Sequence, residues 1–136
     1  MTINGLEAAA DAIMQFEGYF HVDRNGPSVA YRNRNPGNLE TNGQKNAYSD
    51  FATGYSALLR ELHDKFTGNN RHGIGPESTL LDLFNVYAPP SDRNPTNAYC
   101  GFVAHWITIV TGRTVTPQTR LKDIWQAAVD MTEVTT

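Results

Sequence analysis

One carboxylate in the middle of an apolar helix face is the feature that most constrains this chain. The stretch AIMQFEGYF, residues 12–20, contains Glu17 within a mostly apolar run. At about 100° per residue, a helix over residues 4–20 places Glu17 within roughly 20° of Leu6 and roughly 40° of Ile13. A carboxylate on that face must be hydrogen-bonded, paired with a cation or kept protonated. Two interpretations stay open at this point: a structural glutamate that holds a loop, or a catalytic acid.

Length and composition favour one globular domain. The chain has 136 residues, of which 40% are hydrophobic, and its net charge is −3. We therefore expect a single domain over residues 1–136 with a real core. No apolar stretch approaches the roughly 18 residues that a membrane span needs, so no membrane insertion is expected. Lysine and arginine are scattered, which argues against nucleic acid as a partner. The single cysteine, Cys100, excludes an internal disulfide and is interpreted as a core residue.

Hydrophobic periodicity predicts a mainly helical fold. Helices are expected over about residues 4–20 and 52–66, then in a short segment that opens at Ser78 or Glu77. Asn94–Pro95 and Thr116–Pro117 resemble helix starts, for helices that end at Gly112 and near Met131. Residues 21–50 lack helical periodicity, and the segment SVAYR within them is compatible with a short strand. The predicted fold class is mainly α: a single helical domain with a small β-hairpin or irregular insert after the first helix.

The insert directly follows Glu17 and carries side chains that suit a sugar. A loop of this length within a compact domain is usually functional. Its neutral amides and its tyrosine rings match a ligand that presents hydroxyl and acetamide groups without much charge. The relevant residues are Asn33, Asn35, Asn38, Asn42 and Asn46, with Tyr19, Tyr31 and Tyr48. The alternative is that asparagine and glycine occur here only to form turns.

Four blocks of sequence resemble one known family. In order, they are FEGYF, SVAYRNRNPGNLE, YSDFATGYSALLREL and TLLDLFNVYAPPSDRNPTNAY, spread over roughly residues 12–110. Together they are similar to a phage and bacterial group of lysozyme-like lytic transglycosylases and muramidases. RNRNPGNL and YAPPSDRNPTNAY are the specific blocks, whereas Glu-Gly alone would mean little.

The resemblance implies a lysozyme-like fold and a cleft that binds the glycan strands of peptidoglycan. Glu17 matches the catalytic acid of the Glu-Gly block. Asn35, Asn38, Asn94 and Tyr99 match motif positions near the cleft in such proteins, and with Tyr31 they form the predicted substrate-binding set. Asn94 also has a plain structural interpretation as a helix cap.

The chemistry of glycoside cleavage leaves two mechanisms open. A general acid must hold a proton beside the leaving oxygen, which an apolar environment favours. Most glycosidases also need a second carboxylate, for which the sequence offers Asp23, Glu40 and Asp50. In lytic transglycosylases the same glutamate acts as acid and then as base, while the 6-hydroxyl of the sugar closes an anhydro ring. This second mechanism is the preferred prediction.

No cofactor or metal is expected. Glu17 and His21 are four residues apart, but neither an HExxH motif nor a Cys/His cluster is present. The N-terminus lacks the basic region of a secretory signal. We therefore expect synthesis in the cytoplasm and delivery to the cell wall by a phage-type route or a secretion system. The polar composition is compatible with a monomer, which is the expected oligomeric state. The rival hypothesis is a non-catalytic glycan-binding or virion structural module on the same fold.

Overall fold

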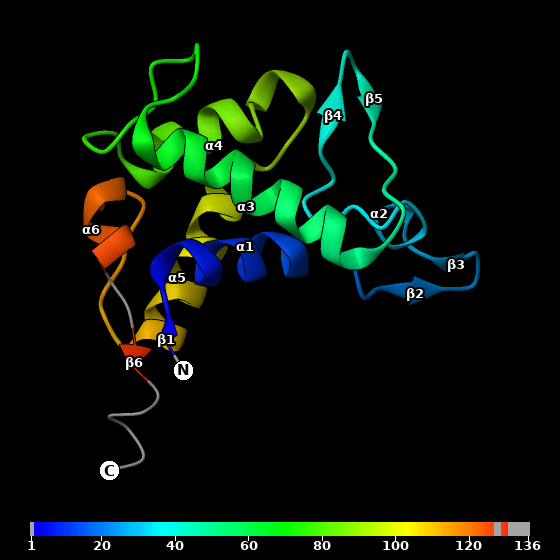
Figure 1. The fold of residues 1–136 in the computed structure, drawn as a ribbon, viewed down its shortest axis with the longest axis horizontal. Helices are drawn as coiled ribbons and strands as arrows, with labels where there is room; N and C mark the ends of the chain where they lie inside the picture. The colour runs from blue at the N-terminus through cyan, green and yellow to red at the C-terminus, as the bar shows by residue number, and fades with distance from the viewer. Residues whose placement is uncertain (1, 127–128, 131–136) are drawn as a thin grey trace.

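A computed structural model describes residues 2–126 and 129–130 and has a mainly helical architecture, as the sequence predicts (Figure 1). Among these residues, no helix is both long enough and apolar enough to span a membrane. The principal helices are α1 (Gly5–Phe16), α3 (Phe51–Thr67), α4 (Leu80–Tyr87), α5 (Thr96–Thr111) and α6 (Leu121–Gln126).

Helix α1 is central, and α5 and α3 pack against it. Its burial extends around the helix instead of following the single apolar face that the sequence predicts, because small alanine side chains let neighbouring elements approach on several sides. Helix α6 meets the start of α1 so closely that a Cβ on Gly5 would lie 1.8 Å from the carbonyl oxygen of Ile124. The buried residues of α1 are Gly5, Leu6, Ala8, Ala9, Ala10, Ala12, Ile13 and Met14.

The surrounding helices complete one core. Fully buried side chains come from each of them, and burying a large apolar side chain contributes about 1.5–3 kcal/mol. They include Leu58, Leu62, Leu80, Leu83, Phe84, Ile107, Leu121 and Ile124. The apolar spacing of residues 121–129 predicts that Trp125 faces the core, but the residue is 39% exposed and its ring packs at the surface against His63 and Phe66.

The ends of the helices differ from the prediction in informative places. Helix α1 begins after Asn4, whose side chain accepts a hydrogen bond from the Glu7 N–H, and ends at Phe16. Glu17 is its C-terminal cap and Gly18 follows with a φ of +72°. Because the chain leaves the helix there, Phe20 does not continue the apolar face and is 59% exposed.

The C-terminal segment is only partly helical. The predicted helix to Met131 is wrong, because α6 covers Leu121–Gln126 and the chain is extended again at β6 (Val129–Asp130). Strand β6 pairs antiparallel with β1 (Thr2–Ile3). Met131 itself lies outside the described residues. Pairing with the distant strand β1 thus replaces the helix that local propensity predicts for residues 129–130.

The insert after α1 contains two small antiparallel hairpins and a short helix. Strands β2 (Val22–Asp23) and β3 (Gly26–Pro27) form one hairpin, and β4 (Glu40–Thr41) and β5 (Gln44–Lys45) form the other. The turn of the second hairpin, Asn42–Gly43, has positive φ at both residues, as a two-residue type I′ turn requires. The segment SVAYR is not a strand: it forms α2 (Val29–Arg32), with Ser28 as its N-terminal cap.

Candidate active site

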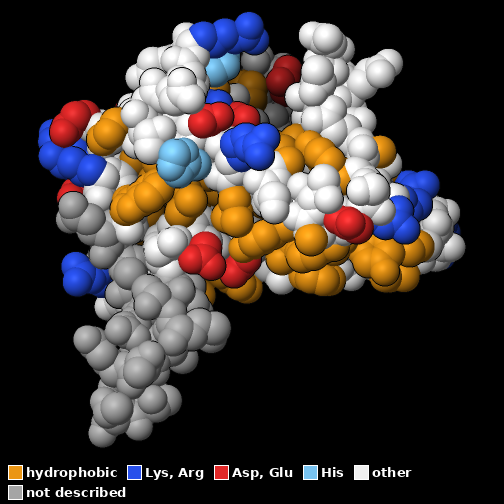
Figure 2. Space-filling model, in the orientation of Figure 1, with side chains coloured by type: hydrophobic (Ala, Val, Ile, Leu, Met, Phe, Trp, Pro, Cys, Tyr) orange, Lys and Arg blue, Asp and Glu red, His pale blue; other side chains and the backbone are white. Residues whose placement is uncertain are grey.

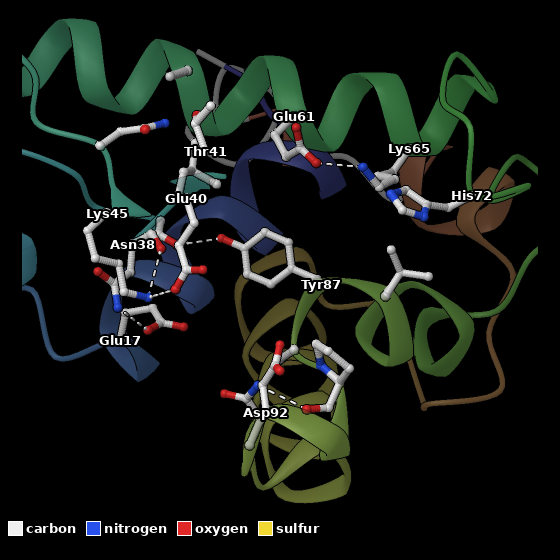
Figure 3. A pocket seen from close by; sticks show the side chains of 18 of the residues that line it. Glu17, Asn38, Glu40, Thr41, Lys45, Glu61, Lys65, His72, Tyr87 and Asp92 are labelled. Atoms are coloured by element: carbon white, nitrogen blue, oxygen red, sulfur yellow. Dashed lines mark hydrogen bonds and ion pairs between the residues drawn. The ribbon is translucent and has the colours of Figure 1, made fainter. Parts of the chain in front are cut away.

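Glu17 lies at the wall of a cleft of about 880 Å³ (Figure 3). The cleft is bounded by one side of α3, by the β4–β5 hairpin with its preceding loop, and by the chain from the end of α4 through the short 3₁₀ helix η1 (Pro90–Asp92) to Asn94. A volume of this size is within the range of ligand pockets in proteins. The C-terminal end of α1 therefore places its carboxylate at the wall of this cleft.

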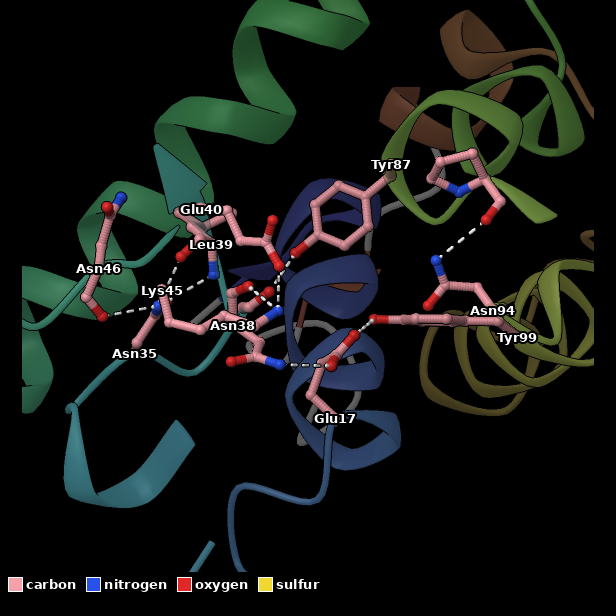
Figure 4. A network of polar contacts seen from close by, with 12 residues as sticks. Glu17, Asn35, Asn38, Leu39, Glu40, Lys45, Asn46, Tyr87, Asn94 and Tyr99 are labelled. Carbon is pink, nitrogen blue, oxygen red and sulfur yellow. Dashed lines mark hydrogen bonds and ion pairs between the residues drawn. The ribbon is translucent and has the colours of Figure 1, made fainter. Parts of the chain in front are cut away.

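Both oxygens of the Glu17 carboxylate accept hydrogen bonds (Figure 4). The Tyr99 hydroxyl donates to Oε2 at 2.7 Å, and the Asn38 side-chain amide donates to Oε1 at 3.2 Å. Tyr99 comes from α5 and Asn38 from the insert, so three segments distant in sequence meet at one carboxylate. Two donors from separate segments therefore fix the orientation of the Glu17 side chain.

Tyr99 is a rigid donor. Its side chain is 1% exposed, and its ring stacks on Phe16 with centroids 4.0 Å apart and contacts Phe84 at 4.8 Å. Burial raises the pKa of Tyr99 well above its ordinary value, and the neighbouring Tyr87 and Glu17 raise it further. The hydroxyl consequently keeps its proton across the physiological range and remains available to the Glu17 carboxylate.

Asn38 is held in an unusual backbone conformation. Its φ is +51°, and its side-chain oxygen is buried without a hydrogen-bond partner among the described residues. The residue before it, Gly37, is pressed against the helices: its carbonyl accepts a 2.6 Å hydrogen bond from the Tyr87 hydroxyl, and a Cβ there would lie 2.7 Å from Leu58 Cδ1. Left-handed backbone and unsatisfied buried polar atoms are concentrated at functional sites.

Asn35 has a structural role, and the predicted contact with substrate is wrong for this residue. Its side chain is fully buried. Its amide nitrogen donates to the carbonyls of Leu39 and Asn46, and its oxygen accepts from the Leu39 N–H. With donors and acceptor all used inside the loop, Asn35 holds the segment that positions Asn38.

The structure places the predicted substrate-binding residues Asn94 and Tyr31 in different hollows. Asn94 lines the cleft, but it does not cap α5: its side chain donates to the Pro89 carbonyl, and α5 begins after Pro95 without a side-chain cap. Tyr31 lies on α2 in a second hollow and does not line the cleft that holds Glu17. Asn38, Asn94 and Tyr99 thus remain near Glu17, whereas Tyr31 does not.

Of the three predicted second carboxylates, only Glu40 lines the cleft. Asp23 accepts from the Asn25 N–H within the β2–β3 turn, and Asp50 caps α3 through the Thr53 N–H. Glu40 forms an ion pair with Lys45 across the β4–β5 hairpin. Glu40 remains a candidate for the second catalytic carboxylate only because it lines the same cleft as Glu17.

The sequence interpretation missed the α3 wall of the cleft. Along this helix, lining residues recur at positions i, i+3, i+4, i+7 and i+8, opposite the apolar face, and this polar periodicity was a readable signal. The buried Lys65 is held there by an ion pair with Glu61. The lining residues of α3 are Ala57, Arg60, Glu61, Asp64 and Lys65. Tyr87 had no local signal, since its partner Gly37 is 50 residues away in sequence.

Within residues 2–126 and 129–130, no three histidine, cysteine, aspartate or glutamate side chains are grouped so that they could hold a metal ion. Comparison with protein-family models, with curated proteins and with solved structures finds no match to this chain. The function must therefore be argued from the geometry of the cleft and from the sequence blocks that surround it.

Proposed function

We propose that this chain is a peptidoglycan-cleaving enzyme of lysozyme-like fold, which breaks the β-1,4 bond between N-acetylmuramic acid and N-acetylglucosamine as a lytic transglycosylase. One observation carries the proposal: the Glu17 carboxylate is fixed between Tyr99 and Asn38 at the wall of a large polar cleft. The resemblance of four sequence blocks to this family supports the same assignment, since they contribute all three residues.

The polarity of the cleft suits an uncharged polar ligand. Glu40 is paired with Lys45 and Glu61 with Lys65, and the cleft is also lined by the acidic residues Asp64 and Asp92 and the basic residues Arg60 and Arg93. Amide and hydroxyl groups of Asn38, Asn46, Tyr48, Ser91 and Asn94 also line the cleft. Such neutral donors and acceptors match the hydroxyl and acetamide groups of amino sugars, whereas a strongly charged ligand would meet both signs of charge.

In the proposed reaction, protonated Glu17 gives its proton to the glycosidic oxygen as the bond from that oxygen to C1 of the muramoyl sugar breaks. The resulting carboxylate then accepts the proton of the 6-hydroxyl of the same sugar, and O6 bonds to C1. The products are a 1,6-anhydro end and a free 4-hydroxyl on the departing sugar, and Glu17 regains its proton. Tyr99 and Asn38 hold the carboxylate in place through both steps.

A hydrolytic muramidase is the second candidate, and the position of Glu40 in the same cleft favours it. In that reaction a second carboxylate acts as nucleophile or activates water, and the product has a reducing end instead of an anhydro ring. The two candidates share the catalytic acid and differ in the product.

Digestion of purified peptidoglycan, followed by mass spectrometry of the soluble muropeptides, tests the proposal. The wild-type protein should release anhydro ends, and Glu17→Gln should lose at least about 100-fold in rate, the lower end expected for a missing general acid. Glu7→Gln makes the same change on α1 away from the cleft and should retain activity. Glu40→Gln should also retain it.

The products separate the candidates. Reducing ends, together with a large loss in Glu40→Gln, would support the muramidase. Release of no fragment, while the protein still sediments with cell-wall sacculi, would support the binding module. Full activity in Glu17→Gln would refute the assignment of the catalytic acid.

A further inference from the structure

A second hollow of about 420 Å³ lies beside α2 and shares none of the residues that line the cleft. Three aromatic rings, one proline and two guanidinium groups surround it. These residues are Tyr19, Pro27, Tyr31, Arg32, Arg34 and Phe51. We name it the aromatic–arginine hollow.

One of its aromatic rings is buried and the other two are partly exposed to solvent. Tyr19 is 5% exposed and forms the floor, while Tyr31 and Phe51 are 49% and 40% exposed. The Tyr19 centroid lies 5.3 Å from that of Tyr31 and 5.4 Å from that of Phe51. Figure 2 shows hydrophobic side chains gathered over this part of the molecule, with Lys or Arg side chains beside them. Exposed aromatic rings that gather in one place can supply the apolar part of a binding site.

The charged residues that line the hollow are both cationic, and the carboxylate of Asp50, next to Phe51, lies close enough to Arg34 to interact with it electrostatically. Arg32 and Arg34 are exposed and form no ion pair among the described residues, and no carboxylate lines the hollow. The chain as a whole carries a net charge of −3. Two guanidinium groups without an ion pair among the described residues therefore give this part of an acidic protein a local positive charge. Guanidinium groups bind planar carboxylate and phosphate groups through paired hydrogen bonds.

We propose that the aromatic–arginine hollow binds a sugar unit that carries a carboxylate or a phosphate. The sugar ring packs on Tyr31 and Phe51, and the anionic group pairs with Arg32 and Arg34. The hollow is within the usual range of pockets for discrete ligands, which favours a single sugar unit over a flat lipid surface. The site would hold an acidic polysaccharide independently of cleavage in the cleft, so the proposal does not depend on the proposed function.

Nuclear magnetic resonance titration of the ¹⁵N-labelled chain of 136 residues tests the proposal. The probes are tetragalacturonate for the carboxylate, glucose 6-phosphate for the phosphate, and chitotetraose as an uncharged glycan. Phosphatidylglycerol–phosphatidylcholine vesicles form a fourth arm, read by sedimentation. At least one acidic probe should shift amide signals of Tyr31, Arg32 and Arg34 at millimolar concentration, and its binding should weaken as salt is added. The probe that does so identifies the anionic group.

Variants assign the binding to the hollow. Arg34→Gln and Tyr31→Ala should each weaken binding of the acidic probe about tenfold, as loss of a charge-assisted contact predicts. Arg113→Gln removes the same charge from an exposed position after α5 and should leave binding unchanged. Unchanged circular dichroism shows that each variant is folded.

Three results would overturn the proposal. The first is the absence of shifts in the hollow with either acidic probe up to about 10 mM, well beyond ordinary weak binding. The second is an equal response to chitotetraose, which would show that charge is irrelevant. The third is vesicle binding that Tyr31→Ala abolishes, without any binding of the acidic sugars, which would assign the hollow to a lipid surface.

Discussion

The hydrogen bond between Tyr99 and Glu17 provides the sharpest test of the site geometry. Tyr99→Phe removes one oxygen atom and leaves the ring between Phe16 and Phe84. The lost bond is 2.7 Å long and reaches a carboxylate, so its contribution is that of a charge-assisted bond, about 1.5–3 kcal/mol. Because Glu17 is only half-buried, water compensates in part and the lower end, about 1.5 kcal/mol, is expected.

A double-mutant cycle isolates this interaction from other effects of the substitutions. Tyr99→Phe, Glu17→Ala and the double variant are compared with the wild-type protein, and the coupling free energy should be about 1–1.5 kcal/mol. Tyr87→Phe is the matched control, because its hydroxyl donates to the Gly37 carbonyl and not to Glu17. It should lower the free energy of unfolding by about 1 kcal/mol on its own and couple to Glu17→Ala by less than about 0.5 kcal/mol.

Urea-induced unfolding at pH 7, followed by tryptophan fluorescence and circular dichroism, measures each free energy. The dependence on urea concentration must be equal among the variants for the comparison to hold. A coupling below about 0.5 kcal/mol between Tyr99 and Glu17, or an equal coupling for the Tyr87 control, would contradict the proposed positioning of the carboxylate.

Other predictions follow from the packing. Gly54→Ala should lower the free energy of unfolding by at least about 3 kcal/mol, because the added Cβ would lie 1.9 Å from the Arg34 carbonyl oxygen. Gly101→Ala in α5 places its Cβ where nothing lies within 4 Å and should raise the free energy of unfolding by about 0.5–1 kcal/mol. Thermal denaturation of the two variants measures both effects. Burial raises the pKa of the Cys100 thiol to about 11, so a thiol reagent at pH 8 should modify it only after denaturation. Burial, opposed by the hydrogen bond from the Tyr55 hydroxyl, also raises the pKa of Asp11. Because the folded protein favours the protonated Asp11 carboxyl, the contribution of this group to stability is complete below its unfolded-state pKa and is lost as the pH rises through its folded-state pKa. Asp11→Asn should therefore gain stability relative to wild type between pH 3 and pH 7. A difference in urea midpoint that does not change with pH would contradict this assignment.

Local signals predicted much of the fold because each acts within a few residues. The apolar spacing of Leu58, Leu62 and Phe66 located α3, and Gly112 marked the end of α5 at its left-handed φ of +73°. The same reasoning failed where the conformation of a segment depends on pairing with residues far away in the sequence. Residues 129–130 are extended because they pair with residues 2–3, and no pattern within residues 117–131 indicates that pairing.

The candidate site divides in the same way. Helical phase identified Glu17 as an unusual carboxylate, since rotation per residue is a local property. The phase argument could not determine that α1 ends at Phe16, or that its last turn opens into a cleft rather than the core. Asn35 and Asn38 belong to one motif and looked equivalent in the sequence. Folding buries the first with its hydrogen bonds satisfied and turns the second toward the carboxylate.

By itself, the sequence predicted a mainly helical fold in which a conspicuous glutamate precedes an amide-rich insert. Only the tertiary structure decided which side chains surround that glutamate. Tyr99 and Asn38 are 82 and 21 residues away from it, and Tyr31, at a distance of only 14 residues, is directed into a different hollow. The physical reason is that periodicity fixes the direction of a side chain within its own element, whereas its neighbours depend on how the elements pack together.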